Sequence, residues 1–275
     1  MPKANSPYAP ARAELRVRVA SARMGARSSS WTARLAAAVL VAGYALLTVV
    51  ASATESPLRP PLPAGVGVPA WGVRTARALG LDGLSRGALT LLSLMVVAAA
   101  VGAFVLLVRE AWNRRASWAL LGCATAAGLV LAMVGPLLLS RDVYSYASYG
   151  RMVARYGANP YRTAPAAFPH DVFTPVISRT WVRTRSVYGP VFTVVSAALA
   201  RVWFGSPGAT VEAFKVVAGL SAAGAAVFGA AATRRLAPGR ERAALCLAGA
   251  NPVIVLHTVG GGHNDALVGL SLIHI

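Results

Sequence analysis

Five apolar runs, each about long enough to cross a lipid bilayer, constrain this chain more than any other feature of its sequence. A spanning helix needs about 20 consecutive apolar residues. In lipid, every backbone N–H and C=O group must be hydrogen-bonded within the protein, and a helix does this within a single segment. We therefore predict an all-α fold, a polytopic bundle of membrane helices. The runs lie near residues 32–52, 88–108, 118–139, 211–232 and 243–259, and a sixth begins at Ala266.

Composition agrees with a membrane protein and argues against a nucleic-acid partner. The chain is 56% hydrophobic and 13% charged, whereas soluble domains carry about 25% charged residues. A net charge of +18 would ordinarily suggest nucleic acid. Here, however, the arginines form short clusters between apolar runs, where the positive-inside rule and lipid phosphates place them. Both cysteines, Cys123 and Cys246, lie inside apolar runs, so no disulfide framework or metal site is expected from them.

The two ends of the chain differ from the rest. Residues 1–31 are rich in Arg, Ser, Pro and Ala, and we expect a disordered basic cytoplasmic tail. The first apolar run has no convincing cleavage site, so we expect a retained anchor rather than a signal peptide. Residues 32–275 are predicted to form one membrane domain, truncated at its C-terminus because the last apolar run stops at Ile275. Whether residues 271–275 are native sequence is left open.

The segment 187–204 decides the predicted topology. Its apolar part is short for a span and is interrupted by Arg201. If it crossed the membrane, the arginine cluster in 233–242 would face outward, against the positive-inside rule. We therefore expect an interfacial or re-entrant helix. In that topology 109–117 and 233–242 face the cytoplasm, while the long loop 140–190 and the turn 260–265 face away from it.

The polar loop 140–190 is the strongest functional signal. Loops this long are usually functional or disordered, and this one is too aromatic for disorder. It opens with Asp142, which either caps the helix predicted over 143–156 or acts as a functional carboxylate at the membrane boundary. On a straight helix Tyr146, Tyr149 and Tyr156 share a face with Asp142. An interfacial aromatic belt is the simpler explanation for any single tyrosine.

Seven arginines in this loop depart from the positive-inside pattern. Arg151 and Arg155 are predicted on the helix face opposite Asp142. The guanidinium fork suits phosphate, although contact with lipid headgroups explains exposed arginines equally well. We predict that a phosphate ligand binds some of this set, which comprises Arg151, Arg155, Arg179, Arg183 and Arg185.

Two further motifs lie at or inside the last complete run. Asn251-Pro252 is expected to interrupt its helix, which either opens space for a substrate or is ordinary proline tolerance in a membrane helix. His263-Asn264-Asp265 follows three glycines and forms either a capped turn or a polar cluster near a substrate. The pair His170-Asp171 lacks further ligands at suitable spacing, so no metal is predicted.

These motifs together resemble the actinobacterial polyprenol-phosphate-mannose-dependent α-1,6-mannosyltransferases, which are integral-membrane glycosyltransferases of the C type. The resemblance covers about residues 32–270 and would be the N-terminal part of such an enzyme. The family places a catalytic Asp in the first large extracytoplasmic loop, and Asp142 matches that position, although two apolar runs precede the helix that leads to it. The motifs are Asp-Val-Tyr-Ser-Tyr-x-x-Tyr-Gly-Arg at 142–151, Gly-x-Asn-Pro-Tyr at 157–161, Tyr-Gly-Pro at 188–190, Asn-Pro at 251–252 and His-Asn-Asp at 263–265.

The resemblance implies an enzyme of the plasma membrane with its active site on the extracytoplasmic face. It would transfer mannose from a polyprenyl-phosphate donor to a glycolipid acceptor of the cell envelope, with inversion, to form an α-1,6 linkage in lipoglycan. Neither cofactor nor metal is implied, and membrane lipids are the remaining partners. The competing possibilities are a transporter or flippase of lipid-linked sugars, or an inactive fragment. The chain alone is expected to be inactive, and the acceptor and the donor sugar are left open.

Under this interpretation Asp142 is the general base. A polyprenyl phosphate is already a good leaving group, so the second carboxylate of a glycosidase is not required. Positive charge that stabilises the departing phosphate is required instead, and the loop arginines supply it. The residues predicted to bind substrate are Tyr146, Tyr149, Asn159, Tyr161, Tyr188, His263, Asn264 and Asp265.

Overall fold

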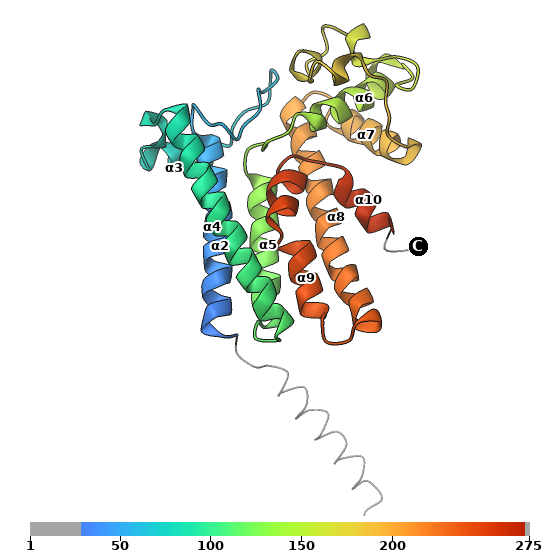
Figure 1. Ribbon diagram of the computed structural model, residues 1–275. Helices are drawn as coiled ribbons and strands as arrows, with labels where there is room; N and C mark the ends of the chain where they lie inside the picture. The colour runs from blue at the N-terminus through green and yellow to red at the C-terminus, as the bar shows by residue number, and fades with distance from the viewer. Residues whose placement is uncertain (1–28, 273–275) are drawn as a thin grey trace, which may run out of the picture.

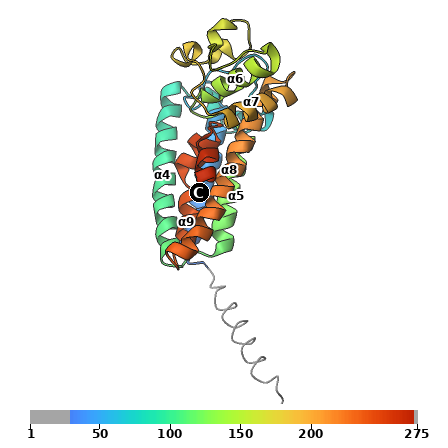
Figure 2. The same ribbon diagram turned by 90° about the vertical axis from the view of Figure 1, so that its right-hand side faces the viewer.

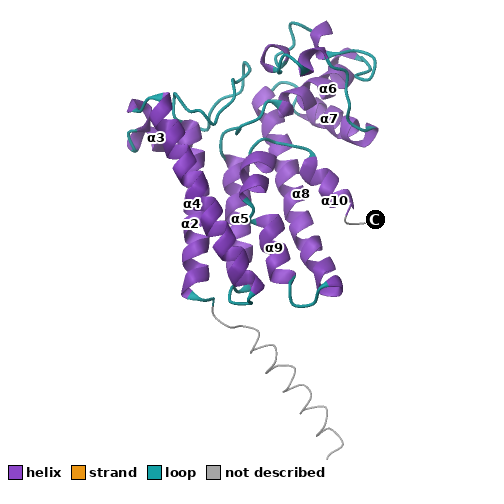
Figure 3. Cartoon of the chain, viewed as in Figure 1, coloured by secondary structure: helices purple, strands orange, loops and turns teal. Residues whose placement is uncertain are grey.

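The computed structural model describes residues 29–272, and within that range the regular structure is entirely helical (Figures 1 and 3). The predicted all-α fold is confirmed. The basic tail up to residue 28 and the last three residues lie outside the described range. The α-helices are α2 (Trp31–Ser52), α3 (Ala70–Ala78), α4 (Arg86–Trp112), α5 (Trp118–Val134), α6 (Asp142–Tyr156), α7 (Pro190–Val202), α8 (Pro207–Leu236), α9 (Glu241–Gly249) and α10 (Asp265–Leu272).

Within residues 29–272, four helical segments are long and apolar enough to cross a membrane: α2, α4, α8 and the combined segment Glu241–Val259. The shorter apolar helix α5 runs alongside them, and together they form a bundle with nearly parallel axes (Figures 1 and 2). Small residues line the contacts, as is usual where membrane helices approach closely. A Cβ added at Gly43 of α2 would lie 3.3 Å from Ala100 of α4. The outer face of α4 exposes leucines, as expected of a surface turned toward lipid.

Two of these helices end or change where glycine and proline dictate. The helix predicted over 118–139 stops at Val134, because Gly135-Pro136 follows and proline cannot donate the next helical hydrogen bond. The predicted interruption at Asn251-Pro252 is confirmed, since α9 ends at Gly249 and a π-helix, Val253–Val259, follows. The Tyr44 hydroxyl donates to the freed Ala250 carbonyl at 2.6 Å, so the break is satisfied inside the bundle.

The arginine clusters of 109–117 and 233–242 meet at one end of the bundle. The Arg240 guanidinium donates to the Trp112 carbonyl at 3.1 Å and lies 3.9 Å from the centre of a Trp112 ring. Arg242 donates to the carbonyl of Arg114 at 3.1 Å. The expectation that these two segments share one side is therefore confirmed. Which side of a membrane that is remains a prediction.

The opposite end of the bundle, called here the site end, carries α6, α7, the loop that joins them and the turn 260–264 (Figure 1). Helix α7 packs against α6 at this end and is inclined to the long helices (Figure 2). It has 13 residues, fewer than a span requires. The expectation that 187–204 does not cross the membrane agrees with this placement.

Candidate functional site

Three polar side chains from separate elements converge at the site end. Asp142 is the first residue of α6, His263 ends the glycine turn, and Asp265 begins α10. Nδ1 of His263 lies 3.7 Å from Oδ2 of Asp142 and 3.6 Å from Oδ2 of Asp265. The predicted convergence of Asp142 with the turn 260–265 is therefore confirmed.

The Asp142 carboxylate is available for chemistry. Arg141 occupies the position before α6, and Ser140 Oγ accepts the Asp142 backbone N–H at 3.1 Å. Asp142 therefore lies inside the first turn rather than at the capping position. Its side chain is 36% exposed, and its polar contact among the described residues is His263.

The backbone before α6 is held in an uncommon conformation that fixes Asp142 beside the turn. Leu139 adopts φ = 63°, which is unfavourable for a residue with a side chain. Its N–H donates to the Leu58 carbonyl at 2.8 Å, and the N–H of Leu138 donates to the Gly260 carbonyl at 2.9 Å. Strain of this kind persists where the surroundings fix it, and it is frequent at functional sites.

Glycine is required where the turn meets α6. Gly262 has φ = 65°, and a Cβ added there would lie 3.1 Å from Val143 Cγ2 and 3.5 Å from Lys215 Cγ. A larger residue would push the turn away from the start of α6 and separate His263 from Asp142.

His263 is buried, and its ring lies 4.3 Å from that of His257. Burial lowers the pKa of His263, His257 lowers it further, and the carboxylates of Asp142 and Asp265 act in the opposite direction. The net lowering keeps the ring neutral near neutral pH. A neutral imidazole has one donor and one acceptor nitrogen. Its Nε2 is buried without a hydrogen-bond partner among the described residues.

The tyrosines of α6 divide between the site and the loop. The Tyr146 hydroxyl donates to Asn264 Oδ1 at 3.3 Å, and its ring lies edge-on to Tyr188, with 5.0 Å between ring centres. Burial raises the pKa of Tyr146, which keeps it a phenol that can donate. Tyr149 donates to the Thr184 carbonyl at 2.8 Å and so holds the loop against α6; burial raises its pKa to about 12.

At the other end of α6 a second carboxylate is buried in an ion pair. Arg151 Nε donates to Asp171 Oδ2 at 2.7 Å, and the two side chains are 4% and 1% exposed. The Tyr156 hydroxyl donates to the same oxygen at 2.9 Å. Arg151 and Tyr156, expected on opposite faces of the helix, thus share one partner. The ion pair gives Arg151 a structural partner in place of a free surface for phosphate.

The remaining predicted phosphate ligands are exposed. Arg155 lies against Phe204, with its guanidinium carbon 5.1 Å from the ring centre. Arg179, Arg183 and Arg185 lie on the loop surface, and Tyr149 fastens the segment of the last two to α6.

Asn159 and Tyr161 shape the loop. Asn159 Oδ1 accepts the Tyr161 N–H at 2.9 Å, and the Tyr161 hydroxyl donates to the Tyr188 carbonyl at 3.0 Å. The two residues border a cavity beside α7 rather than the carboxylate cluster. Their role in binding substrate remains a prediction.

Sequence reasoning missed a charged pair beneath the site. Lys215 of α8 is fully buried, and its Nζ donates to the Gly135 carbonyl and, at 3.2 Å, to Glu212. Its stem passes beside Gly262. The signal was the Glu-x-x-Lys spacing inside a run taken as apolar, because charges within a membrane helix are rare and usually functional.

These features define a polytopic helical membrane protein with an acidic and imidazole site at one end of its bundle. No solved structure matches the chain significantly. The family model described as "Alpha-(1->6)-mannopyranosyltransferase, N-terminal domain" matches residues 63–274, and the chain belongs to this family. The expected family resemblance is thereby confirmed.

Curated relatives carry the same name. Alpha-(1->6)-mannopyranosyltransferase A of Corynebacterium glutamicum is 36% identical over 147 residues, which are 50% of this chain and 29% of that protein. The B protein of the same organism is 30% identical over 156 residues, covering 51% of this chain and 25% of that protein. The A protein of Mycobacterium tuberculosis is 33% identical over 146 residues, with 50% and 27% covered. The chain thus spans less than a third of these relatives.

Proposed function

We propose that this chain forms the N-terminal part of an inverting α-1,6-mannosyltransferase that uses a polyprenyl-phosphate-mannose donor. Family membership supports mannosyl transfer in general. The observation that carries the proposal for the site is Asp142, a half-exposed carboxylate at a helix N-terminus, with buried His263 as its polar neighbour.

Asp142 acts as the general base in this mechanism. Its carboxylate takes the proton from the acceptor hydroxyl as that oxygen attacks the anomeric carbon. The bond between the anomeric carbon and the phosphate oxygen breaks, and its electron pair leaves with the polyprenyl phosphate. Attack from the opposite face inverts the β donor to an α linkage. The acceptor is a glycolipid of cell-envelope lipoglycan.

The surrounding groups supply charge and orientation. Exposed Arg179, Arg183 and Arg185 stabilise the departing phosphate, whereas Arg155 lies about 20 Å beyond Asp142 along α6, too far to contact it. Tyr146, which stays a phenol, and Asn264 form a hydrogen-bonded pair that orients a sugar. Tyr188 packs against Tyr146 behind them. Neutral His263 keeps the Asp142 carboxylate facing the substrate. The Asp265 carboxylate, 3.6 Å from the same ring nitrogen, holds the His263 ring in place.

A transporter of lipid-linked sugars is the second candidate, because the broken helix at Pro252 and the buried Lys215 resemble features of transporters. Full-length enzyme in liposomes, supplied with polyprenyl-phosphate mannose and a glycolipid acceptor, separates the two. We expect mannosylated acceptor with an α-1,6 linkage by NMR, and none with a nucleotide-sugar donor. Donor movement across the bilayer without product would favour transport, and neither result would leave a non-catalytic scaffold.

The active site is proposed to face away from the cytoplasm of the plasma membrane. Cysteines introduced at the exposed positions Ala166 and Pro238 test this after the exposed Cys123 is replaced by serine. An impermeant maleimide added to intact cells should label position 166 and spare 238. Labelling of 238 alone would reverse the orientation and place the arginine-cluster end outside.

A further inference from the structure

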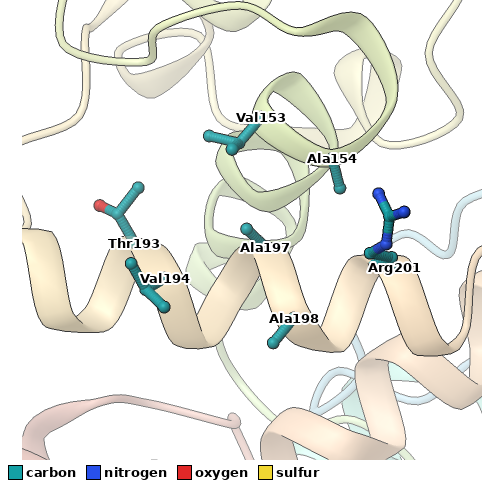
Figure 4. Close-up of a pocket in the computed structure, with 7 residues that line it drawn as sticks. All are labelled: Val153, Ala154, Thr193, Val194, Ala197, Ala198 and Arg201. Atoms are coloured by element: carbon teal, nitrogen blue, oxygen red, sulfur yellow. The ribbon is translucent and has the colours of Figure 1, made fainter.

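An apolar groove lies between α6 and α7, away from the carboxylate cluster. It has a volume of about 390 Å³ and is lined by Val153 and Ala154 of α6 and by a stripe of α7, which consists of Thr193, Val194, Ala197, Ala198 and Arg201. In Figure 4, Ala197 and Arg201 point from α7 toward α6. The volume falls within the range of about 300–1,000 Å³ that is typical of ligand pockets. The alanines leave the space that larger side chains would fill.

The groove continues toward the α6–α7 loop. A second cavity of about 390 Å³ shares Val153 and Thr193 with the first and reaches Asn159 and Tyr161. The two together form an elongated, open groove along α7, a shape that suits a hydrocarbon chain. Arg201 lies at the opposite end from Tyr161.

The surroundings of the groove are those of a membrane interface. Val191 and Val194 of α7 are 75% and 68% exposed, which is unfavourable in water but not in lipid. Trp203 and Phe204 follow Arg201 and are also exposed, as in the aromatic belts at headgroup level. Among the described residues no carboxylate pairs with Arg201. Its charge is therefore available to an anionic headgroup.

The position of the groove excludes the reacting donor. Val153 and Ala154 lie about three turns beyond Asp142 along α6, about 17 Å at about 1.5 Å per residue. In a sugar phosphate, a single oxygen joins phosphorus to the anomeric carbon. A donor phosphate on Arg201 would thus hold its sugar far from Asp142. This step alone rests on the proposed function.

We propose that the groove is a binding site for an anionic phospholipid of the bilayer, with one acyl chain along α7 and the headgroup phosphate on Arg201. The lipid would hold α7 at the interface and keep the packed pair α6–α7, and with it Asp142, at a fixed height above the bundle. Helix α6 meets α7 closely at Gly150, where a Cβ would lie 2.2 Å from the Ser196 carbonyl oxygen, so the two helices are in direct backbone contact.

Native mass spectrometry of the intact protein, titrated with phosphatidylglycerol or phosphatidylcholine in detergent, tests the site without any activity measurement. We expect phosphatidylglycerol to bind more tightly. Arg201→Gln should weaken that binding about fivefold, since an arginine near a lipid surface contributes about 1 kcal/mol. Ala154→Leu, which fills the groove, should weaken binding of both lipids. Arg162→Gln removes the same charge from the α6–α7 loop, outside the groove, and should have no effect.

Two results would overturn the proposal. Equal losses in Arg201→Gln and Arg162→Gln would mean that the lipid responds to general surface charge rather than to this site. Displacement of phosphatidylglycerol by polyprenyl phosphate, abolished in Arg201→Gln, would assign the groove to the donor. A protein that binds phosphatidylglycerol as expected but makes no mannosylated product would uphold this site and refute the proposed function.

Discussion

Two carboxylates lie beside α6, one on the helix and one on the loop after it, and they have opposite environments. Asp171 in the loop is 1% exposed and lies 2.7 Å from Arg151 of α6, with the Tyr156 hydroxyl on the same oxygen. Asp142 at the N-terminal end is 36% exposed and lies 3.7 Å from a histidine whose lowered pKa keeps it neutral. The Asp171 carboxylate has its hydrogen-bond partners within the protein, and these contacts hold the loop against α6. The Asp142 carboxylate has no strong partner among the described residues, which is what its proposed role as a base requires.

This difference shows how a membrane-boundary helix can combine rigidity with reactivity. The buried pair and the Tyr149 hydrogen bond fasten the loop to α6. The strained Leu139 and the glycine turn then set the position of Asp142. A carboxylate held by such supports needs no strong partner of its own, and a general base is more effective without one.

The largest expected effect on stability comes from breaking the buried pair. Asp171→Ala leaves Arg151 buried and unpaired, which should lower the free energy of unfolding by about 3–5 kcal/mol. Replacing both partners, Arg151→Met with Asp171→Leu, should recover most of that loss. Asp142→Asn should cost less than about 1 kcal/mol, the range of a helix-terminus charge effect. Thermal unfolding in detergent measures all three. Similar losses of stability for Asp171→Ala and Asp142→Asn would contradict the proposed difference between the two carboxylates.

Exposed and buried arginines are expected to differ in the same way, the exposed ones affecting kinetics and the buried one affecting stability. Substituting Gln for the exposed arginine that binds phosphate should raise the donor KM or lower kcat by about ten- to a hundredfold, because hydrogen bonds to charged groups contribute about 1.5–3 kcal/mol. The candidates are Arg179, Arg183 and Arg185. Arg151→Gln should instead destabilise the protein. Steady-state kinetics with the lipid donor checks this, and normal kinetics in all three exposed variants would assign them to lipid headgroups.

The smallest expected effect is the pH dependence of His263. Its folded-state pKa lies below the unfolded value of about 6.5. The unfolded state therefore binds more protons in this window, and stability should fall as the pH drops from about 6.5 toward the lower folded pKa. In His263→Gln this part of the slope should disappear. Unfolding series at several pH values measure it; an unchanged slope would mean that His263 titrates as an exposed group.

Much of this arrangement was predictable because it follows from local rules. The lengths of the apolar runs predicted the long helices, and the arginine clusters predicted that 109–117 and 233–242 lie at one end of the bundle. Pro252 predicted the interruption of the last helix. The proximity of Asp142 and His263 followed from counting how many helices cross the membrane between them, which places both at the same end of the bundle. The role of each site residue is still a prediction.

The partners of individual side chains were not predictable, because they depend on packing between distant segments. Nothing near Arg151 in sequence indicates Asp171, which lies 20 residues later and reaches it only when the loop folds back. Lys215 was overlooked because its neighbours are apolar, and its partner Gly135 lies just after another helix, α5. Helical spacing also failed for Tyr156, whose long side chain at the end of α6 reaches Asp171.

The turnover of Asp142→Asn in the full-length enzyme tests the central claim most directly. Asn is about the same size and caps helices about as well, so folding should survive while basicity is lost. General-base catalysis contributes about 10²–10⁴-fold, and we predict at least a hundredfold fall in kcat. Asp265→Asn is the matched control, from which a smaller fall is expected. A folded Asp142→Asn enzyme with nearly parental turnover would contradict the account, and a larger loss in Asp265→Asn would move the base to Asp265.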